Sequence, residues 1–166
     1  GNGANSGSAE VHVWNGSAWV QRGTDIVGEA ANDQSGRSVS LSGDGDILAI
    51  GASFNDGGGF NSGNVRVYTW NGSAWAQRGT DIDGEANSDH VGKSVSISDD
   101  GNTLAIGGGH HVRVHTWNGS AWVKIGADID VAAAEVVSLS KDGSRVSIGA
   151  SSSNNGTGMV QIYEWN

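Results

Sequence analysis

The sequence contains no cysteine and no proline among its 166 residues, and only 16% of them are charged. Without cysteine, no disulfide framework can hold the fold together. Basic residues are scarce: nine Lys and Arg stand against 18 Asp and Glu, which gives a net charge of −9. This balance argues against nucleic acid and anionic membranes as partners, since both require a basic face. Because a signal-peptide pattern and a long apolar run are also lacking, we expect a soluble or already processed chain without membrane insertion.

Tryptophan, by contrast, is concentrated in one repeated hexapeptide. WNGSAW occurs at residues 14–19, 70–75 and 117–122, and Trp165 begins a fourth copy. The copies recur with a period of about 50 residues, which is in the range of propeller blades. The variation in length falls in stretches rich in Gly, Asn and Ser, where insertions are tolerated as loops. The sequence is therefore a tandem repeat of blade-sized units.

Each period contains four short segments with the residue pattern of β-strands. Hydrophobic residues alternate with serine in the first segment, and this period of two is typical of a strand. Asp44-Gly45 stands between the first and second segments and predicts a tight hairpin turn. The four segments are SVSLS at 38–42, ILAIGA at 47–52, VRVYTW at 65–70 and AWVQRG at 18–23, each with echoes in the other periods. We predict an all-β, β-propeller-like array of four-stranded antiparallel blades.

The hexapeptide itself predicts an aromatic hairpin. If Asn15-Gly16 forms a two-residue turn, Trp14 pairs with Ser17 and His12 pairs with Trp19, and the aromatic side chains share one face. The other face is β-branched, and a sheet with two apolar faces must be covered on both sides. An exposed aromatic platform for sugars is the alternative interpretation. We predict an aromatic cluster between blades made of Trp14, Trp19, Tyr68, Trp70, Trp75, His115, Trp117, Trp122, Tyr163 and Trp165.

The hexapeptide also contains a glycosylation sequon. Asn-Gly-Ser gives acceptor positions at Asn15, Asn71 and Asn118, and Asn155-Gly156-Thr157 gives a fourth at Asn155. A surface turn suits a glycan, so these four residues are candidate N-glycosylation sites. A turn sequence that merely matches the sequon is the alternative.

The segment from Gly36 to Trp70 resembles the FG-GAP repeat of integrin-α-type propellers. The resemblance rests on Gly36, the Asp44-Gly45 turn, AIGA at 49–52 and a variable loop followed by VRVY, and residues 91–117 and 136–165 repeat the pattern. It implies an extracellular adhesion or recognition propeller. Many members of the family hold calcium in a loop rich in Asp, but the matching positions here are Ser40, Ser42, Asp44 and Leu48. Because one carboxylate supplies too few oxygens for calcium, we expect no cofactor and no calcium in this turn.

The order of the segments leaves both ends of the array incomplete. We divide the single array into a partial blade at 1–34, blades at 35–82 and 91–129, and a partial blade at 135–166. The first unit lacks its first two strands and the last unit lacks its fourth. Open strand edges invite pairing with another chain, so copies of the chain are expected to complete one another's blades as a ring or a filament. The chain is otherwise a segment of a larger propeller.

Other candidate chemistry is sparse. His111 and His115 lie on one strand face but about 13 Å apart, which is too far to share a metal ion. Asp25, Asp81 and Asp128 recur before isoleucine and predict a turn-capping role. Because no catalytic set interrupts the repeat, we predict that the chain is not an enzyme. The favoured function is an extracellular, self-assembling adhesion or structural protein, with other copies of itself, glycans or extracellular proteins as partners. A glycan-binding lectin and a segment of an integrin-like recognition propeller are the alternatives.

Overall fold

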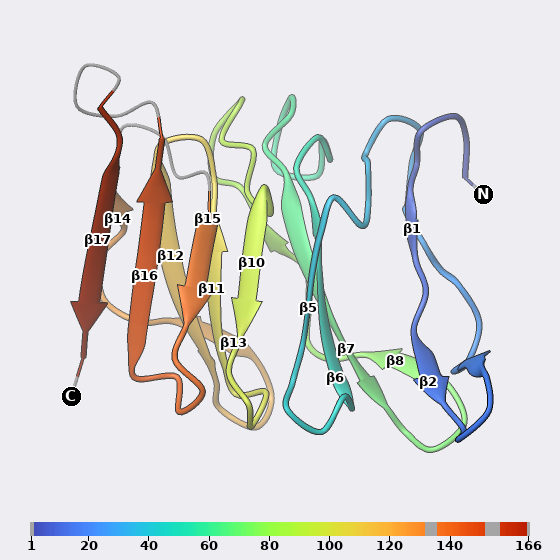
Figure 1. Ribbon diagram of the computed structural model, residues 1–166. Helices are drawn as coiled ribbons and strands as arrows, with labels where there is room; N and C mark the ends of the chain where they lie inside the picture. The colour runs from blue at the N-terminus through green and yellow to red at the C-terminus, as the bar shows by residue number, and fades with distance from the viewer. Residues whose placement is uncertain (1, 132–135, 152–156, 166) are drawn as a thin grey trace.

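A computed structural model describes residues 2–131, 136–151 and 157–165 of the chain. Within these residues it contains seventeen short strands and no helix (Figure 1). All strand pairs are antiparallel, so the predicted all-β class is confirmed. Residues 132–135 and the candidate glycosylation site Asn155 lie outside the described residues.

Two units of the array are complete blades. The first complete blade has the strand order β5 (Ser38–Leu41), β6 (Ile47–Ala52), β7 (Asn64–Trp70) and β8 (Trp75–Gln77), and β9 (Ile82–Asp83) also pairs with β7. The second complete blade repeats this order with β10 (Ser94–Ile97), β11 (Thr103–Gly107), β12 (His111–Trp117), β13 (Trp122–Lys124) and β14 (Ile129–Asp130). The fourth strand of each blade is thus divided into two short strands that pair with opposite ends of the third.

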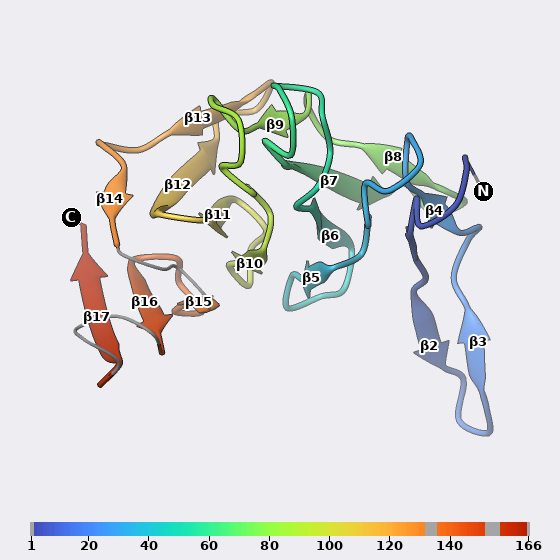
Figure 2. The same cartoon turned by 90° about the horizontal axis from the view of Figure 1, so that it is seen from above.

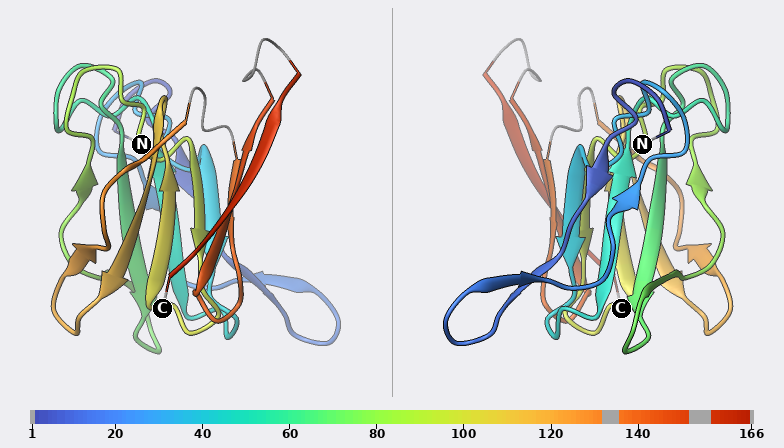
Figure 3. Two further views of the ribbon diagram at one scale, coloured as in Figure 1. Left: turned by 90° about the vertical axis from the view of Figure 1, so that its left-hand side faces the viewer. Right: turned by 90° about the vertical axis from the view of Figure 1, so that its right-hand side faces the viewer.

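The units at the two ends are smaller. The N-terminal half-blade contains β1 (Ser8–Ala9) paired with β4 (Ile26–Val27), and β2 (His12–Trp14) paired with β3 (Trp19–Gln21). The C-terminal blade is a three-stranded sheet of β15 (Val136–Leu139), β16 (Arg145–Ala150) and β17 (Met159–Glu164). Seen from above, the sheets stand side by side in a curved row, with β5, β10 and β15 on the concave side (Figure 2). The β2–β3 hairpin projects away from this row (Figure 3).

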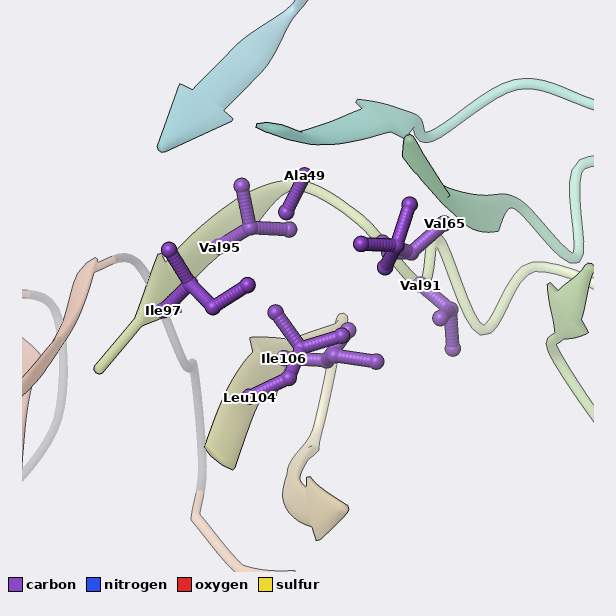
Figure 4. Packing of buried hydrophobic residues seen from close by; sticks show 8 residues of the cluster. Ala49, Val65, Val91, Val95, Ile97, Leu104 and Ile106 are labelled. Atoms are coloured by element: carbon purple, nitrogen blue, oxygen red, sulfur yellow. The ribbon is translucent and has the colours of Figure 1, made fainter. Parts of the chain in front are cut away.

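The hydrophobic core is divided into three clusters, one at each junction between neighbouring units. Strand alternation places side chains on both sides of every sheet, so each junction receives residues from two sheets. The central cluster joins the two complete blades (Figure 4) and contains Ala49, Val65, Val67, Val91, Val95, Ile97, Leu104 and Ile106. The cluster at the N-terminal junction contains Ala9, Val11, Ile26, Leu48, Ile50 and Tyr68. The cluster at the C-terminal junction contains Ala105, Val112, Val114, Val131, Val137, Val146 and Ile148.

The hairpin of WNGSAW differs from the sequence-based prediction. Trp14 is directly opposite Trp19, so four residues rather than two form the loop. The side-chain oxygen of Asn15 accepts hydrogen bonds from the backbone amides of Ser17 and Ala18, both at 2.9 Å. This local competition of an Asn side chain with the backbone widens the turn. The two tryptophans still share a face, and their rings meet edge to face at 5.7 Å between centroids.

Candidate functional site

Each blade presents a forward face to the next unit and a backward face to the preceding one. In the first complete blade the forward face carries Ala49, Val65 and Val67. The backward face carries Leu48, Ile50 and Tyr68, together with Val39 and Leu41 at its inner end. Because the same alternation recurs in every repeat, the forward face of any blade has the shape and apolar character that fit the backward face of another. The junctions between blades are therefore the candidate functional site of this chain.

Serines of the inner strands connect the blades along the concave side. The hydroxyl of Ser40 accepts a hydrogen bond from the backbone amide of Ile97 at 3.1 Å. One blade further on, Ser96 accepts one from Leu139 at 2.9 Å. Among the described residues, the inner strand of each following blade has no strand partner on this side, so its backbone amides donate to serine hydroxyls of the preceding blade instead. These hydrogen bonds matter because a buried N–H without an acceptor is costly. This explains why serine alternates with hydrophobic residues in SVSLS.

Replacement of Ser96 by alanine should lower the free energy of unfolding by about 1 kcal/mol, because the Leu139 amide loses its acceptor. Ser138 occupies the same position in the C-terminal blade, where the forward face is open. Its replacement is the matched control and should have an effect near zero. Urea unfolding of both variants measures the difference, and equal effects would show that the serine position stabilises strands and not junctions.

A Trp–Arg contact joins each complete blade to the unit before it. The guanidinium of Arg78, at the end of β8, lies 4.7 Å from the ring centroid of Trp117 and 5.6 Å from that of Trp122. It also donates to the carbonyl oxygen of Gly101 and to the side-chain oxygen of Asn102, both at 2.7 Å. The indole nitrogen of Trp122 donates back to the carbonyl oxygen of Arg78 at 2.9 Å. One arginine therefore holds the aromatic hairpin and the Asp-Gly turn of the next blade together.

The same contact occurs one repeat earlier. Arg22 lies 4.8 Å from the ring of Trp70 and donates to Asp46 at 2.6 Å, and the Trp75 indole donates to the Arg22 carbonyl oxygen at 2.8 Å. Gly79 and Gly23 follow the arginines at positive φ, and a side chain at Gly79 would collide with Trp117. Sequence reasoning did not identify these arginines. The signal was present in the recurrence of Gln-Arg-Gly after the second tryptophan.

The first and last copies of the aromatic pair depart from this pattern. Trp14 and Trp19 are exposed, because no described unit precedes the N-terminal half-blade, so they differ from the expectation of a position between blades. Trp165 packs against the cluster at the C-terminal junction together with Ile125, which stands where Arg22 and Arg78 stand in the other repeats. Tyr68 and His115 are buried on backward faces, and Tyr163 packs on the C-terminal cluster.

Buried arginines in the third strands join the units at the opposite end of the blades. Arg113 is buried, and its Nε donates to Asp128 at 2.9 Å. Its Nη2 lies 3.5 Å from Glu85, which belongs to the segment connecting the two complete blades. Partial burial acts to raise the pKa of Asp128, but hydrogen bonds from Lys124 and Arg113 outweigh it and lower the pKa to about 2. The guanidinium is thus neutralised within the junction, as a buried charge requires.

The turn-capping role predicted for Asp25, Asp81 and Asp128 is wrong. Asp25 accepts from the side chain of Gln21 at 2.6 Å, and Asp81 accepts from Gln77 at 2.6 Å. Asp128 accepts from Lys124 at 2.7 Å. Each aspartate therefore bridges the two halves of the divided fourth strand, because the residue four positions earlier extends its side chain across the break.

His115 gives the central junction a pH dependence. Burial lowers the pKa of His115 to about 4, and the positive charges of Arg113 and Lys124 act in the same direction. Its pKa in the unfolded chain is near the ordinary 6.5. Protonation therefore favours the unfolded chain: the contribution to stability is complete above pH 6.5 and is lost as the pH falls toward 4.

Replacement of His115 by tyrosine, the residue at the same position of the preceding blade, should remove this component. We expect wild type to lose up to about 3 kcal/mol more than the variant between pH 6.5 and pH 4. Unfolding free energies measured across this range test the prediction. Parallel pH profiles for the two proteins would contradict it.

One blade face in the array is open, and a second is open at its inner end. Val160 and Ile162, on the forward face of the C-terminal blade, are 75% and 70% exposed, whereas Val65 and Val67 at the same positions of the first complete blade are buried. At the other end Val39 and Leu41 are 54% and 46% exposed. Val95 and Ile97, their counterparts one repeat later, are buried in the central cluster. The exposed residues are thus junction residues without a neighbour among the described units.

The remaining sequence-based sites are placed as follows. Asn15, Asn71 and Asn118 are exposed in hairpin turns, where each side-chain oxygen is bound to the turn backbone. In the first Asp-Gly turn Asp44 accepts from the Ser42 hydroxyl at 2.6 Å. Among the described residues no group of three or more His, Cys, Asp or Glu is arranged to hold a metal ion, and the absence of calcium stays a prediction. Within the same residues no helix is long and apolar enough to cross a membrane.

Comparison with known proteins identifies one repeat and the fold. Residues 28–68 match the FG-GAP repeat, so the resemblance is confirmed for this segment. A search of curated proteins finds no match. Among solved structures, a protein from Bacteroides uniformis provisionally assigned as a 6-phosphogluconolactonase matches 97% of this chain and 45% of its own, at TM-score 0.67 and 15% identity. Hydrazine synthase of Kuenenia stuttgartiensis matches 86% of this chain and 48% of its own, at TM-score 0.58 and 16% identity.

These matches show the fold, a β-propeller-like array, and this chain spans less than half the length of either structure. They also correct the prediction that the chain is not an enzyme, because both matched structures are named as enzymes. The prediction rested on the regularity of the repeat. A regular repeat does not exclude catalysis, since catalytic groups are often carried by loops that leave the strands of a scaffold unchanged.

Proposed function

We propose that this propeller array functions by associating with other copies of itself through its open blade faces, as an adhesion or structural protein outside the cell. The observation that carries the proposal is the exposure of Val160 and Ile162 at positions that are buried in both complete blades. Within the chain, forward faces pack on backward faces at successive junctions. The forward face of the C-terminal blade in one copy therefore matches the exposed inner end of the backward face, at Val39 and Leu41, in a second copy. Such a head-to-tail contact forms a ring if it closes and a filament if it does not.

The repeat also indicates how the strands would meet between copies. The C-terminal blade lacks a fourth strand, and β3 of a second copy has the sequence of that strand. By the register of β7 with β8, Trp165 would lie opposite Trp19 and Glu164 opposite Val20. To pair with β17, β3 of the second copy would have to separate from its own β2. This pairing is the weaker one, because three residue pairs join β2 and β3 whereas six join β16 and β17. The exposed Trp19 would then enter a junction, as Trp75 does in the first complete blade.

Disulfide trapping tests this register directly, because the chain has no cysteine of its own. Oxidation of a mixture of Glu164→Cys and Val20→Cys proteins should give a linked heterodimer. Residues opposite each other in an antiparallel pair have Cα atoms about 4.5–5.5 Å apart, which suits a disulfide. Non-reducing gel electrophoresis measures the yield.

The matched control pairs Glu164→Cys with Ala76→Cys. Ala76 occupies the position of Val20 in the first complete blade, where it is already paired with Thr69. This mixture should give only collisional cross-linking. Equal yields in the two mixtures, or no linked product in either, would overturn the proposed contact.

An extracellular location is supported by the FG-GAP segment and by the positions of the sequons. Asn15, Asn71 and Asn118 are exposed at turns, where a glycan can be accommodated. We propose that they carry N-linked glycans in the secreted protein. Treatment of the protein from its source with a glycosidase should then lower its mass, and an unchanged mass would contradict the proposal.

One observation favours a second candidate function. Trp14 and Trp19 form an exposed pair of aromatic rings, the kind of surface on which a sugar ring can stack. In a lectin, Trp14→Ala would abolish sugar binding without changing the mass of the assembly. Self-association does not require a sugar. In that proposal Trp14 separates from Trp19 when β3 leaves β2 to pair with a second copy.

A further inference from the structure

A small cavity opens between the two complete blades at the end where the inner strands β5 and β10 begin. Its volume is about 170 Å³, and it is lined by Arg37, Ser53, Phe54, His90, Lys93 and Gly109. Arg37 and Lys93 occupy the same position in successive repeats, immediately before the first inner-strand serine. The cavity thus receives one basic residue from each of the two blades.

The charge of this cavity is exceptional in the molecule. The chain carries a net charge of −9. Arg22, Arg66, Arg113, Lys124, Lys141 and Arg145 form ion pairs with carboxylates. Arg78 is held by the Trp–Arg contact. Among the described residues Arg37, Arg78 and Lys93 lack a carboxylate within ion-pair distance. Of these three, Arg37 and Lys93 line this cavity.

The aromatic wall of the cavity is fixed in place. The guanidinium of Arg37 lies 5.4 Å from the ring centroid of Phe54, and that ring meets His90 edge to face at 5.2 Å. The Nδ1 of His90 lies 3.0 Å from the carbonyl oxygen of Ser53. Because a carbonyl oxygen only accepts, Nδ1 carries the hydrogen, and Nε2 of the neutral ring can accept a hydrogen bond from a hydroxyl group of a ligand. Arg37 uses one N–H to reach Gln34 and retains the rest of its donors.

We propose that this cavity binds the oxyanion end of a small molecule, a carboxylate, sulfate or phosphate group. Guanidinium and ammonium groups are the donors that such groups prefer, and charge-assisted hydrogen bonds are the strong ones. Two cations that share a cavity repel each other, and an anion between them removes the repulsion. The volume is below the 300–1,000 Å³ typical of sites for drug-sized ligands, so it accommodates one anionic group and a few further atoms, such as an acidic sugar unit. The inference does not depend on self-association.

Calorimetric titration with sodium sulfate, sodium phosphate and sodium glucuronate tests the site. At least one probe should bind the wild-type chain with a Kd in the millimolar range, on the order of 1 mM. Arg37→Gln should weaken that binding about tenfold, because it removes the charge-assisted hydrogen bonds. Lys93→Gln should also weaken it and carries the test if Arg37→Gln does not fold. Preference for glucuronate indicates a sugar acid, and equal binding of sulfate or phosphate indicates a free anion.

Lys141→Gln is the matched control. It changes the net charge by the same amount at an exposed lysine that pairs with Asp99. If it weakens binding as much as Arg37→Gln does, the effect is one of overall charge and the site is refuted. Failure of all three probes to bind wild type below about 10 mM would likewise overturn the proposal.

Discussion

Replacement of Trp122 by alanine is expected to lower the free energy of unfolding by about 4 kcal/mol. The side chain packs against the cluster between the two complete blades, and its indole nitrogen donates to the carbonyl oxygen of Arg78. The variant loses the packing, leaves that oxygen without its donor and removes one of the two rings on which Arg78 lies. Far-UV circular dichroism during urea unfolding, at concentrations too low for assembly, gives the free energy.

Trp19 provides the control for this variant. It occupies the same position in its hairpin, but its side chain is exposed and no described arginine lies over it. Trp19→Ala should therefore cost less than about 1 kcal/mol. If the two variants were equally destabilised, tryptophan would stabilise its own hairpin rather than the junction, and the account of the Trp–Arg contact would be wrong.

Aspartates on the open faces are expected to abolish association completely. Val160→Asp with Ile162→Asp blocks the forward face of the C-terminal blade, and Val39→Asp with Leu41→Asp blocks the open inner end of the backward face of the first complete blade. Each double variant should remain folded, since all four side chains are exposed within one chain. Each should be monomeric alone, because burial of the new carboxylates in a junction is too costly.

A mixture of the two double variants gives the sharper result. Each retains the face that the other has lost, so the mixture should form dimers and nothing larger. Phe60→Asp, which alters an equally exposed apolar residue in the loop between β6 and β7, should assemble as wild type does. Association of either double variant with itself would indicate contact between like faces and contradict the head-to-tail arrangement.

The sequence predicts those features of the fold that depend on residues close together in the chain, namely the strands and the faces of each strand. The alternation in SVSLS and ILAIGA fixes neighbouring strands and their two faces, so the all-β array follows from it. The divided fourth strand was missed because Ile82–Asp83 is too short to show a period. The turn at Asn15 was misjudged because its side chain replaces backbone partners, which the Asn-Gly signal does not reveal.

The contacts between blades were less accessible to sequence reasoning. Arg78 and Trp122 are 44 residues apart, and their contact depends on how two sheets pack. Arg37 and Lys93 are 56 residues from each other and meet for the same reason. The repeat nevertheless indicated where to look. Residues such as Arg22 and Arg78 recur at the same place in successive repeats but are not part of the alternating strand pattern, and such residues are candidates for contacts between repeats.

Sedimentation or light scattering of the unmodified chain over a range of concentrations shows whether the open blade faces associate. If they do, the mass exceeds the 16.9 kDa of one chain and rises with concentration toward rings or filaments. A folded monomer of 16.9 kDa at every concentration, with Val160 and Ile162 still exposed, would contradict the proposed association.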